Sequence, residues 1–185
     1  FAFVSDLSLW YLRRSRNRVG PTAEDITDKN NFYFTLWTVL KEYTKILAPL
    51  TPFVTEEIYR NLTQEDSVHL SLWPDIKRDL YNKELEEQME KAIRLSSKIN
   101  AFRKEAGVKV KIPFRELEYK GPSKISQDIE KIVIDEVNVY NLKYTNKIED
   151  YEVFGYKSEK NLDLIAGKAR EIIIKIQEER KRLGT

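Results

Sequence analysis

Four arginines lie within six positions near the start of the chain, in the segment WYLRRSRNR at residues 10–18. On a helix, this arginine-rich face continues the apolar stripe that Phe3 and Leu7 begin, without a change of direction. A guanidinium pairs with phosphates and base edges through a planar fork, and an indole ring stacks on an unpaired base. The pattern is therefore compatible with RNA contact through one helix face. The candidate RNA-binding residues on that face are Trp10, Arg13, Arg14, Asn17 and Arg18.

A second interpretation explains the same arginines without RNA. The end of an amphipathic helix that extends past its core is solvated, and its arginines pair with Asp or Glu of the helices expected at about 51–62 and 79–106. Such a helix belongs to a structural or protein-interaction scaffold. Pattern alone leaves both interpretations open, and runs of charge are more often solvated faces than binding sites.

Another basic group, Arg103, Lys104, Lys109 and Lys111, follows much later in the chain. Residues 108–114 alternate in polarity, so Lys109 and Lys111 are expected on one face of a strand. Lysines commonly protect an exposed sheet edge from pairing with another chain. On pattern alone, edge protection is the favoured interpretation of these lysines.

Residues suited to catalysis or metal binding are scarce. His69 is the single histidine and there is no cysteine, so a metal site has little support and none is expected. The six glycines form no phosphate-cradling loop of the GxxxxGKS type. We expect a structural role for His69 and no catalytic residue, which makes an independent enzyme the weakest hypothesis.

Composition narrows the class of protein. The 185 residues carry 32 Lys+Arg against 30 Asp+Glu, a net charge of +2, which excludes a uniformly basic nucleic-acid binder. Hydrophobic residues make up 41%, enough for a sizeable core, and no apolar run is long enough to span a membrane. The lack of cysteine fits a reducing compartment.

The elements that must position these residues are mostly helical. Helical spacing covers residues 1–19, 31–47, a stretch that begins at Thr51-Pro52, and 79–106. Four helices joined by short links predict an up-and-down four-helix bundle, so the fold class is mainly α. The bundle is expected to form one domain over residues 1–107.

Beyond Gly107 the periodicity changes, which predicts a second domain over residues 108–185: a small α+β unit with a trailing helix. The chain starts and stops within helical patterns, so we expect it to be part of a larger protein. The expected strands cover residues 108–121, 138–146 and 151–156, and the expected helices cover 123–138 and 162–183.

Three segments together resemble class I aminoacyl-tRNA synthetases of the isoleucyl, valyl and leucyl group. LSLWYLRRSRNR at 7–18 is similar to the opening helix of their anticodon-binding bundle. LAPLTPFVTEEIYRNL at 47–62 and SVHLSLWP at 67–74 resemble segments shared across the group, in the expected order and spacing.

Later segments resemble the isoleucyl branch of the group: AFRKEAGVKVKIPF at 101–114, DEVNVYNLKY at 135–144 and GKAREIIIKIQEERKRLG at 167–184. Two positions depart from that pattern, because Lys111 stands where arginine is usual and Tyr140 where lysine is common. The His-Ile-Gly-His and Lys-Met-Ser-Lys-Ser signatures of the catalytic domain are absent from the sequence.

The resemblance implies a module that binds the anticodon stem-loop of an isoleucine tRNA, and it adds Arg103, Lys109 and Lys111 to the RNA-binding candidates. It implies that the full-length enzyme ligates isoleucine to its tRNA with ATP and magnesium, whereas this part needs no cofactor and is inactive alone. The implied partners are tRNA and the catalytic domain of the same chain, in a cytoplasmic monomer that does not contact membranes. The corresponding valyl domain is the alternative within the group.

Overall fold

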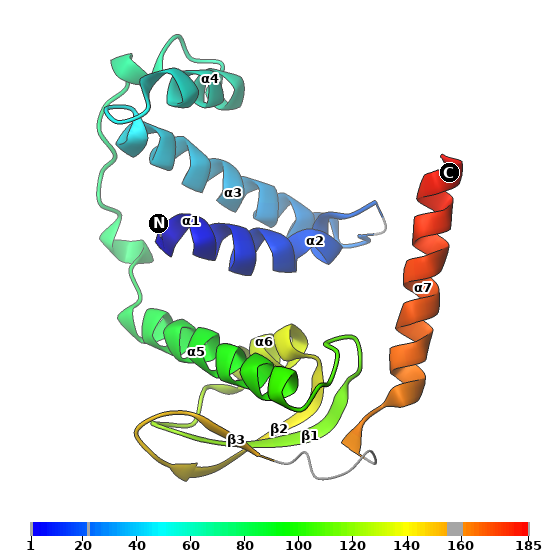
Figure 1. The fold of residues 1–185 in the computed structure, drawn as a ribbon. Helices are drawn as coiled ribbons and strands as arrows, with labels where there is room; N and C mark the ends of the chain where they lie inside the picture. Colours follow the sequence, from blue (N-terminus) through cyan, green and yellow to red (C-terminus); the bar gives the residue numbers. More distant parts are fainter. Residues whose placement is uncertain (1, 22, 155–160, 185) are drawn as a thin grey trace. The chain divides into compact units, whose positions relative to one another are not determined.

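The computed structural model describes residues 2–21, 23–154 and 161–184 (Figure 1). The chain divides into two compact units, Phe1–Tyr81 and Asn82–Thr185. Each unit has its own buried residues, and each is described separately below.

The first unit opens with one continuous helical segment, which confirms the helix predicted up to residue 19. It consists of α1 (Ala2–Asp6), a π-helical stretch η1 (Leu7–Leu12) and α2 (Arg13–Val19). Gly20 then turns to an extended conformation and ends the helix. A π-helical stretch is uncommon and is often found at functional sites.

Helix α3 (Ile26–Leu47) begins five residues before the predicted start at residue 31. Asp25 explains the earlier start, because its side chain accepts a hydrogen bond from the backbone N–H of Asp28 at 2.9 Å. Helix α4 (Pro52–Thr63) starts at a proline, as predicted. The short 3₁₀ turns η2 (Val68–Leu70) and η3 (Arg78–Leu80) follow it.

Aromatic contacts hold the N-terminal segment on α3. Tyr11 stacks on Phe32 with ring centroids 5.4 Å apart, and Phe3 contacts Tyr43 at 4.9 Å. One side of the first helical segment therefore packs against α3 inside the unit.

The second unit combines helices with a small mixed sheet. Its elements are α5 (Lys83–Glu105), β1 (Phe114–Gly121), α6 (Gln127–Val137), β2 (Val139–Lys147), β3 (Glu152–Phe154) and α7 (Leu164–Leu183). The strand order is β2-β1-β3, with β1 parallel to β2 and antiparallel to β3. Helix α6 makes the crossover that a parallel pair requires.

Helix α5 packs in this second unit. Its apolar residues Ala92, Leu95 and Ile99 are fully buried in the same core as Phe114 and Val133, from β1 and α6. The secondary structure is mainly helical, which confirms the predicted class. The division between the two compact units falls between Tyr81 and Asn82, whereas the predicted domain boundary follows residue 107. The buried face of α5 explains this difference.

The strand predicted for residues 108–114 was wrong for most of its length. Ile112 N donates to Lys109 O at 3.0 Å, which closes a turn, and Pro113 has no N–H to offer a sheet. Consequently β1 starts only at Phe114. Residues 155–156 of the last predicted strand lie outside the described residues.

Candidate nucleic-acid interface

The first helix places Trp10 and Arg14 against each other at the junction of η1 and α2. The guanidinium carbon of Arg14 lies 5.8 Å from the centre of the Trp10 ring system, a cation–π contact. Both side chains are half-buried. The pair presents a flat ring beside a fixed positive charge, which is the combination that an unstacked base and its phosphate require.

Arg13 and Asn17 are exposed on the same face as Trp10, as their spacing predicts. The Nε of Arg13 donates to the Leu9 carbonyl at 3.0 Å, which directs the guanidinium along the helix surface. The structure therefore brings together four of the five predicted residues of this face as a polar, cationic surface.

Arg18, the fifth, forms an ion pair. Its Nε donates to Asp28 Oδ2 at 2.7 Å and its Nη2 to Asp28 Oδ1 at 2.5 Å. The hydrogen bond from Arg18 is the main cause that lowers the pKa of the Asp28 carboxyl. At this arginine the structure thus shows pairing with a carboxylate, as the scaffold interpretation expects, but the carboxylate comes from the start of α3 and not from α4 or α5.

Arg103 requires a correction, because the structure buries it with 1% of its surface exposed. Its guanidinium donates to the carbonyls of Ile112, Val137 and Asn138 at 2.6–3.0 Å and lies 4.2 Å from the Phe114 ring centre. Arg103 therefore cannot contact RNA in this structure. Burial, with a contribution from the charge of Arg170, lowers the pKa of Arg103 to about 10, so it stays protonated at neutral pH.

The buried guanidinium of Arg103 has a structural task instead. It joins the end of α6 to the segment between α5 and β1, where Lys109 and Lys111 lie. Asn138 supports the same segment by donating from Nδ2 to the Val110 carbonyl at 2.7 Å. These bonds hold in place a stretch that is not part of the sheet.

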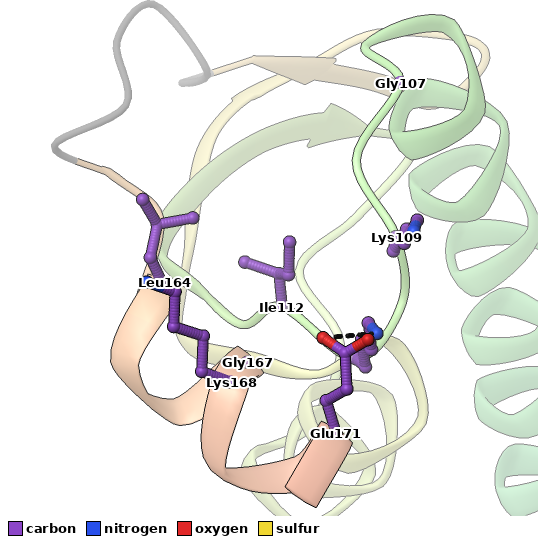
Figure 2. A pocket seen from close by; sticks show the side chains of 8 residues that line it. Gly107, Lys109, Ile112, Leu164, Gly167, Lys168 and Glu171 are labelled. Atoms are coloured by element: carbon purple, nitrogen blue, oxygen red, sulfur yellow. Dashed lines mark ion pairs between the residues drawn. The ribbon is translucent and has the colours of Figure 1, made fainter.

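Lys109 and Lys111 line a groove against α7 (Figure 2). Lys109 is exposed, and the Nζ of Lys111 forms an ion pair with Glu171 at 3.0 Å. Lys168, which the sequence analysis missed, lines the same groove. From the sequence, only a trailing helix is expected over residues 162–183, and the approach of α7 to Ile112 brings Lys168 beside the other two lysines.

His69 is exposed on η2, and its backbone N–H donates to Ser67 Oγ at 3.1 Å. Within residues 2–21, 23–154 and 161–184, no group of three or more His, Cys, Asp or Glu side chains could hold a metal ion. No helix in that part of the chain is both long and apolar enough to cross a membrane.

Comparison with known proteins agrees with the segment resemblances. The family model "Anticodon-binding domain of tRNA ligase" matches residues 1–119. The isoleucine–tRNA ligase of Clostridium acetobutylicum is 34% identical over 96% of this chain and 17% of its own length. That of Pyrococcus abyssi is 36% identical over 76% of this chain and 14% of its own length. That of Treponema denticola is 31% identical over 88% of this chain and 15% of its own length.

The chain thus spans less than a fifth of the length of these relatives. The family match includes all of the first unit and continues through α5 and most of β1. It also includes the arginine-rich helix face. The chain belongs to the family of anticodon-binding domains of tRNA ligases.

Proposed function

We propose that this chain binds the anticodon stem-loop of an isoleucine tRNA as a domain of an isoleucine–tRNA ligase. The contact between Trp10 and Arg14 carries the proposal, because it sets a stacking surface and a cation on the helix that opens the family match. Arg13 and Asn17 extend that surface toward phosphate and sugar groups. Isoleucine is chosen over valine because the relatives named above are isoleucine–tRNA ligases.

In the full-length protein, a catalytic domain in the same chain would activate isoleucine with ATP and magnesium and transfer it to the tRNA. The present chain contains neither catalytic signature and is expected to be inactive alone. Its role would be to position the tRNA, without a cofactor of its own. We further propose that the full-length protein is a cytoplasmic monomer.

The direct test is binding of the 185-residue chain to isoleucine and valine tRNA transcripts at two salt concentrations. Isoleucine tRNA should bind more tightly, and its affinity should fall steeply with salt, with a log–log slope of about −0.7 per single-strand phosphate contact. Equal, salt-independent retention of both tRNAs would contradict the proposal.

The forked pair of Arg18 and Asp28 favours a second function at one position, that of a structural scaffold. If all the helix arginines served packing alone, their removal would lower stability and leave tRNA binding unchanged. Stability and affinity must therefore be measured for the same variants.

A further inference from the structure

A basic groove lies in the second unit, between residues 107–112 and the first turns of α7 (Figure 2). Its volume is about 310 Å³, and its charged lining residues are three lysines and one glutamate. Lys109 and Lys111 precede β1, whereas Lys168 and Glu171 belong to α7. Two segments far apart in the sequence thus supply positive charge to one concave site.

The two sides of the groove are fixed by close packing. A Cβ at Gly167 would lie 2.9 Å from Ile112 Cγ1, so only glycine lets α7 approach this closely. The carbonyl of Lys111 accepts a hydrogen bond from Arg170 at 3.3 Å, and that of Ile112 accepts one from Arg103 at 2.9 Å. A preorganised groove loses little conformational entropy when it binds a ligand.

The groove already holds one anionic group of the protein itself. The hydrogen bond from Lys111 is the largest of the causes that lower the pKa of Glu171, and the charges of Lys111, Lys175 and Lys109 act in the same direction. A carboxylate is therefore stabilised at the place where an external anion would meet the same lysines. Glu171 can be regarded as an internal competitor for that anion.

We propose that this groove binds the phosphodiester backbone of the tRNA. Lys109 and Lys168 contact phosphates, and Lys111 leaves its ion pair with Glu171 to contact the RNA. The proposal rests on the tRNA-binding function above. It adds a separate contact site, in which the Glu171 carboxylate competes with the RNA for Lys111. Lys168 becomes an RNA-binding residue, and Glu171 becomes a residue that weakens binding.

The chemistry of the lining favours a backbone phosphate over a free nucleotide. Lysine is a point charge that attracts phosphates without reading a base. Among the described residues that line the groove, none is aromatic, so a base has no ring to stack on. Ile112 and Leu164 supply the apolar part of the lining, against which a sugar can lie.

Removing a lysine of the groove and removing its glutamate should change tRNA affinity in opposite directions. Lys109→Ala and Lys168→Ala should each weaken tRNA binding and reduce the magnitude of the log–log salt slope by roughly 0.7. Glu171→Gln should tighten binding by roughly two- to fivefold, because a surface ion pair that opposes binding is removed.

The experiment is a filter-binding titration of the 185-residue chain with isoleucine tRNA, at 50 and 200 mM salt. Lys131→Ala and Asp128→Asn are matched controls, since this exposed ion pair on α6 lies outside the groove. Circular dichroism melts show whether each variant is folded. A parallel titration of inorganic phosphate as competitor, in the low-millimolar range, tests for a small-anion site.

Weaker binding by both lysine variants and tighter binding by Glu171→Gln, with unchanged controls, would support the groove. Effects no larger than those of the controls, or weaker binding by Glu171→Gln, would overturn it. If low-millimolar phosphate raises the melting temperature of the unaltered chain but not of the lysine variants, and does not displace tRNA, that would also overturn it, in favour of a small-anion site. If the groove variants are silent while the chain still binds tRNA, only this inference fails; if the unaltered chain binds no tRNA, the proposed function fails.

Discussion

Arg18 at the end of α2 and Asp28 in the first turn of α3 are joined by two parallel hydrogen bonds, at 2.7 and 2.5 Å. The pair bridges the link between the two helices, where Gly20 ends the first one. A forked pair of this kind fixes orientation as well as distance. It separates Arg18 from Arg13 and Arg14, which lie on the same helix but not in this pair.

From this pairing, and from the contact of Arg14 with the Trp10 ring, we predict that Arg18→Ala costs less tRNA affinity than Arg14→Ala. Arg18 must leave Asp28 before it can contact RNA, so its net gain from a phosphate is small. We expect less than about a twofold loss for Arg18→Ala and a larger loss for Arg14→Ala, measured by fluorescence anisotropy. A larger loss for Arg18→Ala than for Arg14→Ala would contradict this prediction and would assign the main RNA contact to Arg18.

Trp10→Ala should remove a stacking surface for a base. Stacking of a base on an aromatic side chain contributes roughly 1–3 kcal/mol, so affinity for tRNA should fall by about fivefold or more. Trp73→Ala is the matched control, because Trp73 is 65% exposed and lines a pocket with residues of α3 and not of η1 or α2. Equal losses for the two variants would remove Trp10 from the binding site.

Arg103→Met should destabilise the second unit severely while keeping the volume of the side chain. The carbonyls of Ile112 and Val137 would lose their donors in a buried site, whereas that of Asn138 would keep the backbone N–H of Phe114. Each buried group left without a partner costs roughly 1–3 kcal/mol, so a loss of about 2 kcal/mol or more is expected. Urea unfolding measures this loss, with the exposed Arg115→Met as control. An equal, small loss for both variants would contradict the role given to Arg103.

Gly121→Ala should destabilise the sheet. A Cβ at this position would lie 2.4 Å from Cε1 of the buried Tyr151 ring, so the strand or the ring must move. We expect a loss of roughly 1–3 kcal/mol in a thermal or urea melt, as for overpacking of a core. Adding Tyr151→Leu should recover part of that loss, and a double variant with strictly additive losses would show that the two residues do not clash.

Acid should weaken the first unit through Glu56. Its carboxylate accepts hydrogen bonds from Val68 N at 2.8 Å and Ser67 Oγ at 2.9 Å, and the backbone bond from Val68 is the main cause that lowers its pKa below 4.5. A lowered pKa in the folded state stabilises it at pH values above about 4.5, and this contribution is lost as pH falls through the folded value.

The variant that tests this is Glu56→Gln, compared with the exposed Glu24→Gln. Urea unfolding between about pH 6 and pH 3 should show a smaller loss of stability for Glu56→Gln than for the unaltered chain. The Glu24→Gln chain should keep the original pH dependence. Identical pH profiles for all three proteins would show that Glu56 contributes nothing to acid unfolding.

Local sequence signals predicted most of the helices and strands. Proline at the start of α4 and the apolar spacing of α6 were sufficient, because those signals act within a few residues. The turn at residues 107–113 was missed because Lys109 and Ile112 close it with a backbone hydrogen bond that polarity cannot reveal. The packing of α5 in the second unit depends on contacts with α6, which periodicity does not specify.

The sequence predicted some residues of the candidate site and missed or misplaced others. The face shared by Trp10, Arg13 and Arg14 follows from helical spacing alone. Arg103 was wrongly expected to contact RNA, since composition cannot distinguish an arginine in solvent from one that binds buried carbonyls. Lys168 could not be found at all, because its proximity to Lys109 requires two distant segments to meet.

The most direct test of the central claim is the salt dependence of isoleucine-tRNA binding for the Arg13→Ala plus Arg14→Ala double variant. Arg60→Ala, an exposed arginine on α4, serves as the control. If the helix face binds RNA, the double variant should bind more weakly and its log–log salt slope should be smaller in magnitude by roughly 1.4, two phosphate contacts, while its melting profile stays the same. Unchanged affinity and slope in a folded double variant would contradict the account.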